Sequence, residues 1–103
     1  MRVIKPVDFI GDKAWDALDI EKIRNASIRL HWTDEPYIWH INDGPEVFVV
    51  LQGTVDMHVR NASDEKIITL QTGDIFHAEM GDEHKAVPNG TARILVIETD
   101  GSI

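Results

Sequence analysis

The chain has 103 residues, a formal net charge of -8 and no cysteine, and this length predicts one domain. A hydrophobic fraction of 43% beside 27% charged residues is typical of a folded protein and excludes a disordered chain. The lack of cysteine excludes disulfides, cysteine-based zinc sites, iron–sulfur clusters and thiol catalysis.

The first 24 residues show no clear periodicity, and we expect an irregular or partly helical N-terminal arm there. Residues 12–24 contain good helix formers, with Ala14, Trp15 and Leu18 roughly on one side. This pattern allows one or two helical turns or an extended segment. Residues 1–6 lack the apolar stretch of a signal peptide, so we expect a cytoplasmic protein.

From about residue 25 onward, apolar and polar residues alternate with the period of two that is typical of β-strands. Ile28, Leu30 and Trp32 share one face of the first segment, and His31 is expected to point outward. The apolar run at residues 47–51 is typical of a strand that is covered on both faces. The predicted strands are residues 27–32, 37–42, 46–52, 55–60, 66–70, 74–79, 84–87 and 92–99.

Turn-forming residues separate these segments. Gly53, Gly73 and Gly81 each lie where a predicted strand ends and the chain must reverse, which requires positive φ. Eight short strands at this spacing predict an all-β sandwich or barrel over residues 25–99. Residues 1–103 would thus form a single domain, a β-barrel with an arm at residues 1–24.

Four polar side chains in this strand region are the candidates for chemistry: His40, Asn42, Glu46 and His84. His40 and Asn42 lie two residues apart on one predicted strand, so their side chains point the same way. Glu46 opens an apolar strand, where a buried carboxylate must be paired or bound to a cation. Two histidines and one carboxylate are a sufficient ligand set for a divalent ion. Taken singly, each of these residues is more often a solvated or hydrogen-bonded side chain.

Taken together, the two stretches resemble the two sequence motifs of the cupin superfamily. The first motif runs G-x5-H-x-H-x3-4-E-x6-G. His40, Glu46 and Gly53 match it, while Asn42 replaces the second histidine and Asp34 stands in place of the leading glycine.

The second motif runs G-x5-P-x-G-x2-H-x3-N. Gly73, Gly81 and His84 match it, while Glu79 replaces the proline and Pro88 replaces the asparagine. The motif match covers residues 39–84, and the strand pattern extends the resemblance to residues 25–99.

The resemblance implies a small single-domain cupin with the fold of a jelly-roll β-barrel. Metal-binding members of that superfamily hold the ion inside the barrel with three histidines and one glutamate. Carried over, His40, Glu46 and His84 would be ligands, and Asn42 would offer a neutral oxygen in place of the remaining histidine. Such a ligand set suits iron, manganese, nickel or zinc, and the identity of the metal stays open.

The other histidines and the aromatic residues are assigned to structural roles. We expect His77 and Glu79 at the surface, and His58 to point outward like His31. The aromatic side chains expected to pack in a core or interface are Trp32, Tyr37 and Trp39.

Three functions stay open at this level. The asparagine in the ligand set favours a binding protein for a small polar metabolite, such as a sugar derivative or an organic acid. A metal-dependent enzyme, either an isomerase or a dioxygenase, would use the ion as Lewis acid or oxygen activator. An interaction module with a vestigial cavity would use neither metal nor ligand.

The expected partners follow from charge and shape. An acidic chain repels phosphate backbones and anionic lipid, and no apolar run approaches the roughly 18 residues of a membrane span. We therefore expect a small-molecule ligand, no nucleic acid and no membrane. A small barrel leaves sheet edges unpaired, so we also expect a homodimer that forms through sheet faces or edges.

Overall fold

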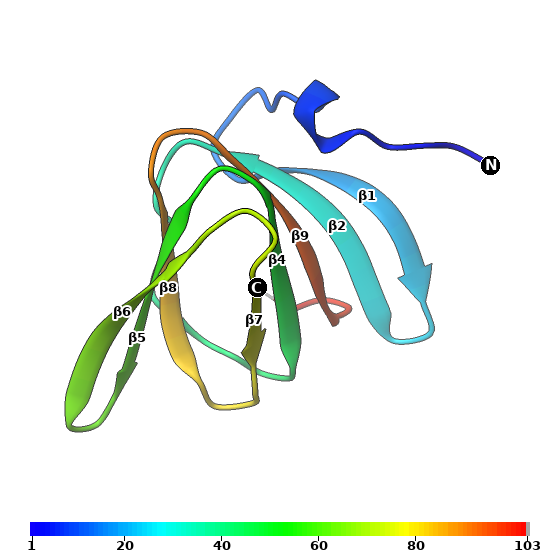
Figure 1. Cartoon of the computed structure of the whole chain (residues 1–103). Coiled ribbons are helices and arrows are strands. Elements are labelled where there is room, and N and C mark those ends of the chain that lie inside the picture. The colour runs from blue at the N-terminus through cyan, green and yellow to red at the C-terminus, as the bar shows by residue number, and fades with distance from the viewer. Residues whose placement is uncertain (103) are drawn as a thin grey trace.

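Two antiparallel β-sheets pack face to face in the computed structural model, which describes residues 1–102 (Figure 1). A 3-10 helix at Pro6–Asp8 precedes the strands β1 (Asp16–Ile23), β2 (Ala26–Thr33), β3 (His40–Ile41), β4 (Glu46–Gln52), β5 (Val55–Asn61), β6 (Asp64–Leu70), β7 (Ile75–Ala78), β8 (Glu83–Pro88) and β9 (Ala92–Thr99). The five-stranded sheet has the order β1-β2-β9-β4-β7, and the four-stranded sheet has the order β3-β8-β5-β6. This arrangement confirms the predicted all-β jelly roll.

The segment at residues 12–24 differs from the arm or helical turns that we expected. Most of it forms β1, an edge strand that pairs with β2 along nearly its whole length. The register shifts between Asp19 and Glu21, and such a bulge interrupts the alternation by which a strand is recognised. Pairing with β2 then outweighs helix propensity, which is a weak preference. Within residues 1–102, no helix is long and apolar enough to cross a bilayer.

The hydrophobic core lies between the two sheets and is formed by alternate residues of the inner strands. Its buried members are Phe48, Val50, Val55, Met57, Leu70, Ala86, Ala92, Ile94 and Val96. The apolar run of β4 is buried on this inner face, whereas Val47 and Val49 on its outer face are only half-buried. The expected cover on both faces of β4 is therefore partial within one chain.

The N-terminal segment crosses the outer face of the five-stranded sheet. Arg93 on β9 donates a hydrogen bond to the backbone oxygen of Phe9, and Arg2 donates to the backbone oxygens of Asp19 and Ile20 on β1. Between these two anchors lies β2, where Leu30 is only 1% exposed although it faces away from the core between the sheets. We infer that the arm supplies this cover.

Candidate metal centre

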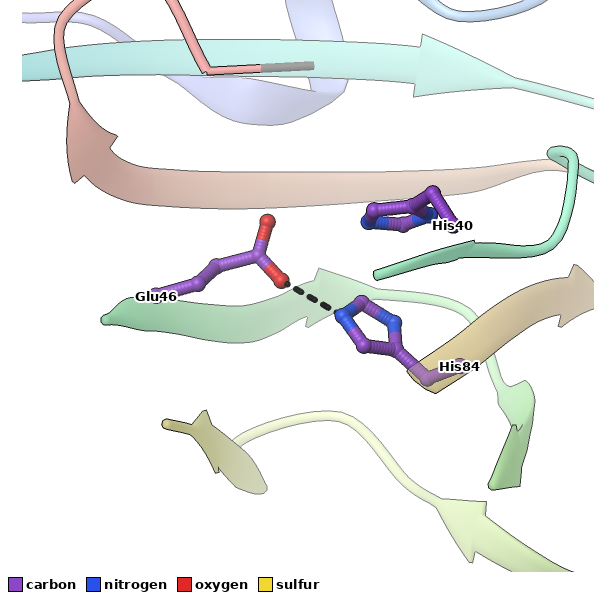
Figure 2. A group of neighbouring side chains, drawn as sticks. All are labelled: His40, Glu46 and His84. Carbon is purple, nitrogen blue, oxygen red and sulfur yellow. Dashed lines mark ion pairs between the residues drawn. The ribbon is translucent and has the colours of Figure 1, made fainter. Parts of the chain in front are cut away.

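His40, Glu46 and His84 meet inside the barrel although they come from both sheets (Figure 2). His40 on β3 lies directly opposite His84 on β8 in the four-stranded sheet, and their ring centroids are 4.2 Å apart. Glu46 is the first residue of β4 in the five-stranded sheet. One candidate ligand atom from each residue lies within 4.8 Å of the other two. The predicted convergence of these side chains on one cavity is thus present.

The ring of His84 is the centre of the polar contacts. Its Nε2 lies 3.2 Å from Oε1 of Glu46 and 2.5 Å from Oδ1 of Asn42. His84 and Glu46 are only 2% and 6% exposed. An imidazole nitrogen carries at most one hydrogen, so Nε2 cannot donate to both oxygens.

Two buried polar atoms of the cluster lack a hydrogen-bond partner within residues 1–102, namely Oε1 of Glu46 and Nδ1 of His84. Leaving a buried carboxylate oxygen unpaired is costly, and such atoms need an explanation in a folded protein. A cation near Nε2 of His84 would satisfy the oxygens of Glu46 and Asn42 together. The donor set therefore fits a divalent metal ion.

Backbone contacts orient the other two members of the cluster. Nδ1 of His40 lies 3.2 Å from the backbone oxygen of Ile38, a contact that places the hydrogen on Nδ1 and leaves Nε2 free as a ligand. Nδ2 of Asn42 donates to the backbone oxygen of Gly44 at 3.2 Å. This hydrogen bond fixes the amide so that its oxygen, rather than its nitrogen, faces His84.

Glu98 adds a second carboxyl group to the cavity. It lies on β9 directly opposite Glu46 on β4. Burial and the neighbouring Glu46 carboxylate raise the pKa of Glu98 to about 8. Burial alone would raise the pKa of Glu46, but the contacts with His84 and Glu98 outweigh it and lower that pKa. At neutral pH the pair therefore holds one proton, mainly on Glu98, and Glu46 is the anion.

A cavity of about 300 Å³ opens beside the cluster. It is lined by Trp15, Arg29, His31, Tyr37, His40, Glu46, Phe48, His84, Ala86, Val96, Glu98 and Ser102. Five of these residues are aromatic or aliphatic, and the other seven are polar and include the three members of the cluster. This composition is typical of a small-molecule site.

Four polar residues of this wall were not predicted from the sequence: Arg29, His31, Glu98 and Ser102. The expectation that His31 points outward is wrong, because the polar face of β2 lines the cavity and the face with Ile28 and Leu30 points away from it. Tyr37 was assigned to packing, and it packs on Trp15 and His40 while also lining the cavity. Alternation identified the two faces of β2 correctly, but a polar cavity reverses the usual rule for which face is inside.

Most of the other assignments agree with the structure. His77 and Glu79 are exposed. Trp39 does not line the cavity, but it lies outside the hydrophobic core as well: the guanidinium carbon of Arg60 lies 3.8 Å from the centroid of the Trp39 ring. His58 alternates with the buried Met57 on β5 and lies on the outer side, near Glu65.

The chain belongs to the cupin family, because the family model described as a cupin domain matches residues 30–98. No curated protein matches the chain.

Several solved structures share the fold. A cupin-2 domain containing protein from Shewanella frigidimarina is 28% identical, with a TM-score of 0.76 over 86% of this chain and 84% of that one. A cupin superfamily protein from Desulfitobacterium hafniense is 18% identical, with a TM-score of 0.77 over 95% and 90% of the two chains. A hydroquinone 1,2-dioxygenase in complex with Fe3+ is 17% identical, with a TM-score of 0.77 over 87% of this chain and 29% of that chain.

Proposed function

We propose that this cupin binds a divalent metal ion with His40, Glu46 and His84, and a small polar metabolite in the adjacent cavity. Asn42 is the candidate for a fourth, neutral ligand. The observation that carries the proposal is the convergence of two imidazoles on a buried carboxylate whose Oε1 has no hydrogen-bond partner within residues 1–102. When bound, the ion would supply a Lewis acid and a point of attachment for a ligand oxygen.

Metal titration of chelator-treated protein tests this function. Mn2+, Fe2+, Ni2+ and Zn2+ are added separately while the melting temperature and the dissociation constant are measured. An ion whose free concentration is 100 times its dissociation constant stabilises the folded state by about 2.7 kcal/mol. We expect Glu46→Gln to abolish this stabilisation, since it removes the only ionised carboxylate of the cluster and nearly preserves its shape.

The matched control is His77→Gln, which changes an exposed histidine on β7. It should leave the metal response unchanged. The proposal is overturned if none of the four ions stabilises the wild-type protein, or if Glu46→Gln responds as strongly as the wild type. The first result would leave an interaction module with an unused cavity as the better description.

A metal-dependent enzyme is the second candidate, and the two histidines and one carboxylate of the cluster are compatible with it. Two histidines and one carboxylate leave open positions on iron, an arrangement that suits oxygen activation. Structural likeness to the dioxygenase shows only that the fold is shared. Oxygen consumption by the Fe2+-loaded protein, measured against a panel of catechols and hydroquinones, distinguishes an oxygenase from a binding protein. Consumption that requires both iron and substrate would establish the enzyme.

A further inference from the structure

Arg29 is the one arginine in the lining of the cavity that holds the metal cluster. It lies on β2 between Ser27 and His31, on the face that points into the barrel. Arg29, Glu98 and Ser102 also line a neighbouring groove of about 490 Å³. Arg29 thus stands where the cavity meets the groove, and a ligand that reaches the cluster from the groove would pass it.

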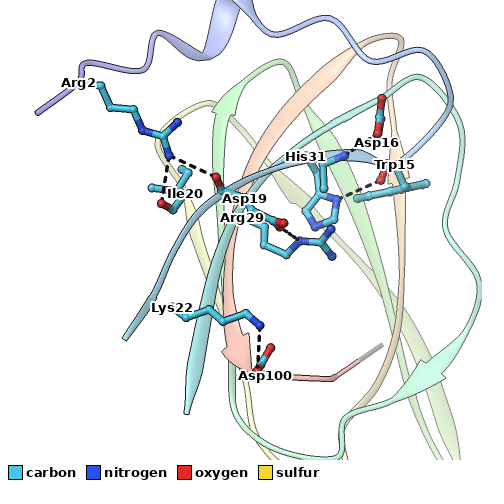
Figure 3. Close-up of polar contacts among 10 residues, drawn as sticks. Arg2, Trp15, Asp16, Asp19, Ile20, Lys22, Arg29, His31 and Asp100 are labelled. Atoms are coloured by element: carbon cyan, nitrogen blue, oxygen red, sulfur yellow. Dashed lines mark hydrogen bonds and ion pairs between the residues drawn. The ribbon is translucent and has the colours of Figure 1, made fainter. Parts of the chain in front are cut away.

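The guanidinium of Arg29 is held from one side only. Its Nε donates to Oδ1 of Asp19 on the adjacent strand at 2.7 Å, and Asp19 is largely exposed. Within residues 1–102, this is the only side-chain hydrogen bond of the guanidinium. Figure 3 shows the group extending from Asp19 toward the ring of His31. Both terminal nitrogens are therefore free to donate, and the bond to Asp19 limits the motion of the fork.

The charge of Arg29 acts inside the cavity. It contributes to lowering the pKa of His31, so it lies close to that ring. A divalent cation held at the cluster would add further positive charge to the same cavity. The cation and the two free terminal nitrogens of Arg29 would both attract an anionic ligand.

We propose that Arg29 anchors the carboxylate of the ligand while a neighbouring oxygen of the same molecule reaches the metal cluster. A planar guanidinium matches a carboxylate with two parallel hydrogen bonds. The lining of the cavity also contains Trp15, Tyr37 and Phe48, which suits a ligand with a short apolar or aromatic body. This inference rests on the proposed function, and it narrows the ligand to a small carboxylic acid with an adjacent hydroxyl or carbonyl oxygen.

The test compares three acids with their neutral amides on the metal-loaded protein: salicylate with salicylamide, mandelate with mandelamide, and pyruvate with pyruvamide. Dissociation constants are measured by calorimetry. We expect at least one acid to bind more tightly than its amide. Arg29→Met should raise the dissociation constant of that acid by about 10- to 100-fold, as expected for loss of charge-assisted hydrogen bonds. It should leave the dissociation constant of the amide unchanged. Arg29→Lys should bind the acid with an intermediate affinity, because a lysine retains the charge but lacks the planar pair of terminal N–H groups.

Arg60→Met is the matched control, since Arg60 also pairs with a carboxylate but lies outside the lining of the cavity. It should not change the preference for acids. Metal affinity, measured on the same Arg29 variants, should equal that of the wild type. If the protein binds metal but prefers none of the acids, or if Arg29→Met keeps the preference, the role of Arg29 is overturned while the metal site stands. If wild-type protein binds no metal, the proposed function itself fails.

Discussion

Glu46 and Glu98 show how one residue can set the charge state of another inside the barrel. Two carboxyl groups directly opposite each other on β4 and β9 cannot both ionise cheaply. Glu46 lies nearer the histidines and becomes the anion, and Glu98 keeps its proton. The cluster is thereby left with a single ionised carboxylate beside two imidazoles. This balance is consistent with a site for a divalent cation.

The raised pKa of Glu98 predicts a pH dependence of stability in metal-free protein. Its pKa is about 8 in the folded chain against 4.5 for the free side chain. Between these values the folded state binds more protons than the unfolded state, so the free energy of unfolding falls as pH rises. His31, whose pKa burial lowers below 6.5, acts in the opposite direction only below that pH. Between pH 6.5 and 8 the effect of Glu98 is therefore not opposed by that of His31.

Urea unfolding at pH 6.5 and pH 8 measures this effect. Wild-type protein treated with chelator should be less stable at pH 8 than at pH 6.5, and Glu98→Gln should lose most of this difference. Glu79→Gln, at an exposed position, should keep it. An equal pH response in wild type and Glu98→Gln would contradict the assignment of the shared proton.

Among the elements, most strands could be predicted, whereas the face of β2 that points into the barrel could not. Seven of the eight predicted strands are present over most of their length because each alternates or is continuously apolar between turn residues, and the strand predicted at residues 37–42 is reduced to His40–Ile41. The strand β1 was not identified, because a bulge near Ile20 shifts its alternation. The spacing of the motifs identified His40, Asn42, Glu46 and His84. Polar residues of β2 and β9 were not identified, since local sequence does not reveal that a barrel interior is polar.

Gly53, between β4 and β5, and Gly73, between β6 and β7, should differ in how much an alanine substitution destabilises the protein. Gly53 and Gly73 both have a φ of +94°, which disfavours any L side chain. A Cβ on Gly53 would lie 2.6 Å from the backbone oxygen of Thr91, whereas a Cβ on Gly73 would meet nothing within 4 Å. We expect Gly73→Ala to lower the free energy of unfolding by about 1–2 kcal/mol. Gly53→Ala should cost a further 1–3 kcal/mol or so, because the backbone of β9 must shift.

Chemical denaturation of the two variants measures this difference directly. Gly73→Ala is the control for the conformational penalty alone. Equal losses in the two variants would show that the approach of β9 to Gly53 is looser than the structure indicates.

For the whole molecule, the outer face of the five-stranded sheet bears on the expected homodimer. Leu95, Val49 and Ile75 form one cross-strand row on this face, and Ile75 is 65% exposed. Val47 and Ile97 form the neighbouring row and are half-buried. We propose that a second copy of the chain covers these rows, since a contiguous apolar face is typical of an interaction surface.

Light scattering after size exclusion tests this proposal. We expect a mass of twice 11.6 kDa, and Ile75→Lys should shift the protein toward the monomer without unfolding it. Thr72→Lys, at an exposed position in the turn before β7, should leave the dimer intact. A monomer at millimolar concentration would contradict the proposal.

The division of the candidate ligands between the two sheets has a consequence for affinity. A shared ion would crosslink the sheets, since Glu46 lies on β4 and His84 on β8. The contact between Asn42 and His84 alone joins residues that are 42 positions apart along the chain. Closing so long a loop is entropically unfavourable, so the denatured chain cannot assemble these groups by itself. The measured affinity for the ion therefore falls in proportion to the fraction of molecules in which the two sheets are packed together. Substitutions that loosen the barrel far from the ion should weaken its retention as surely as those that touch it.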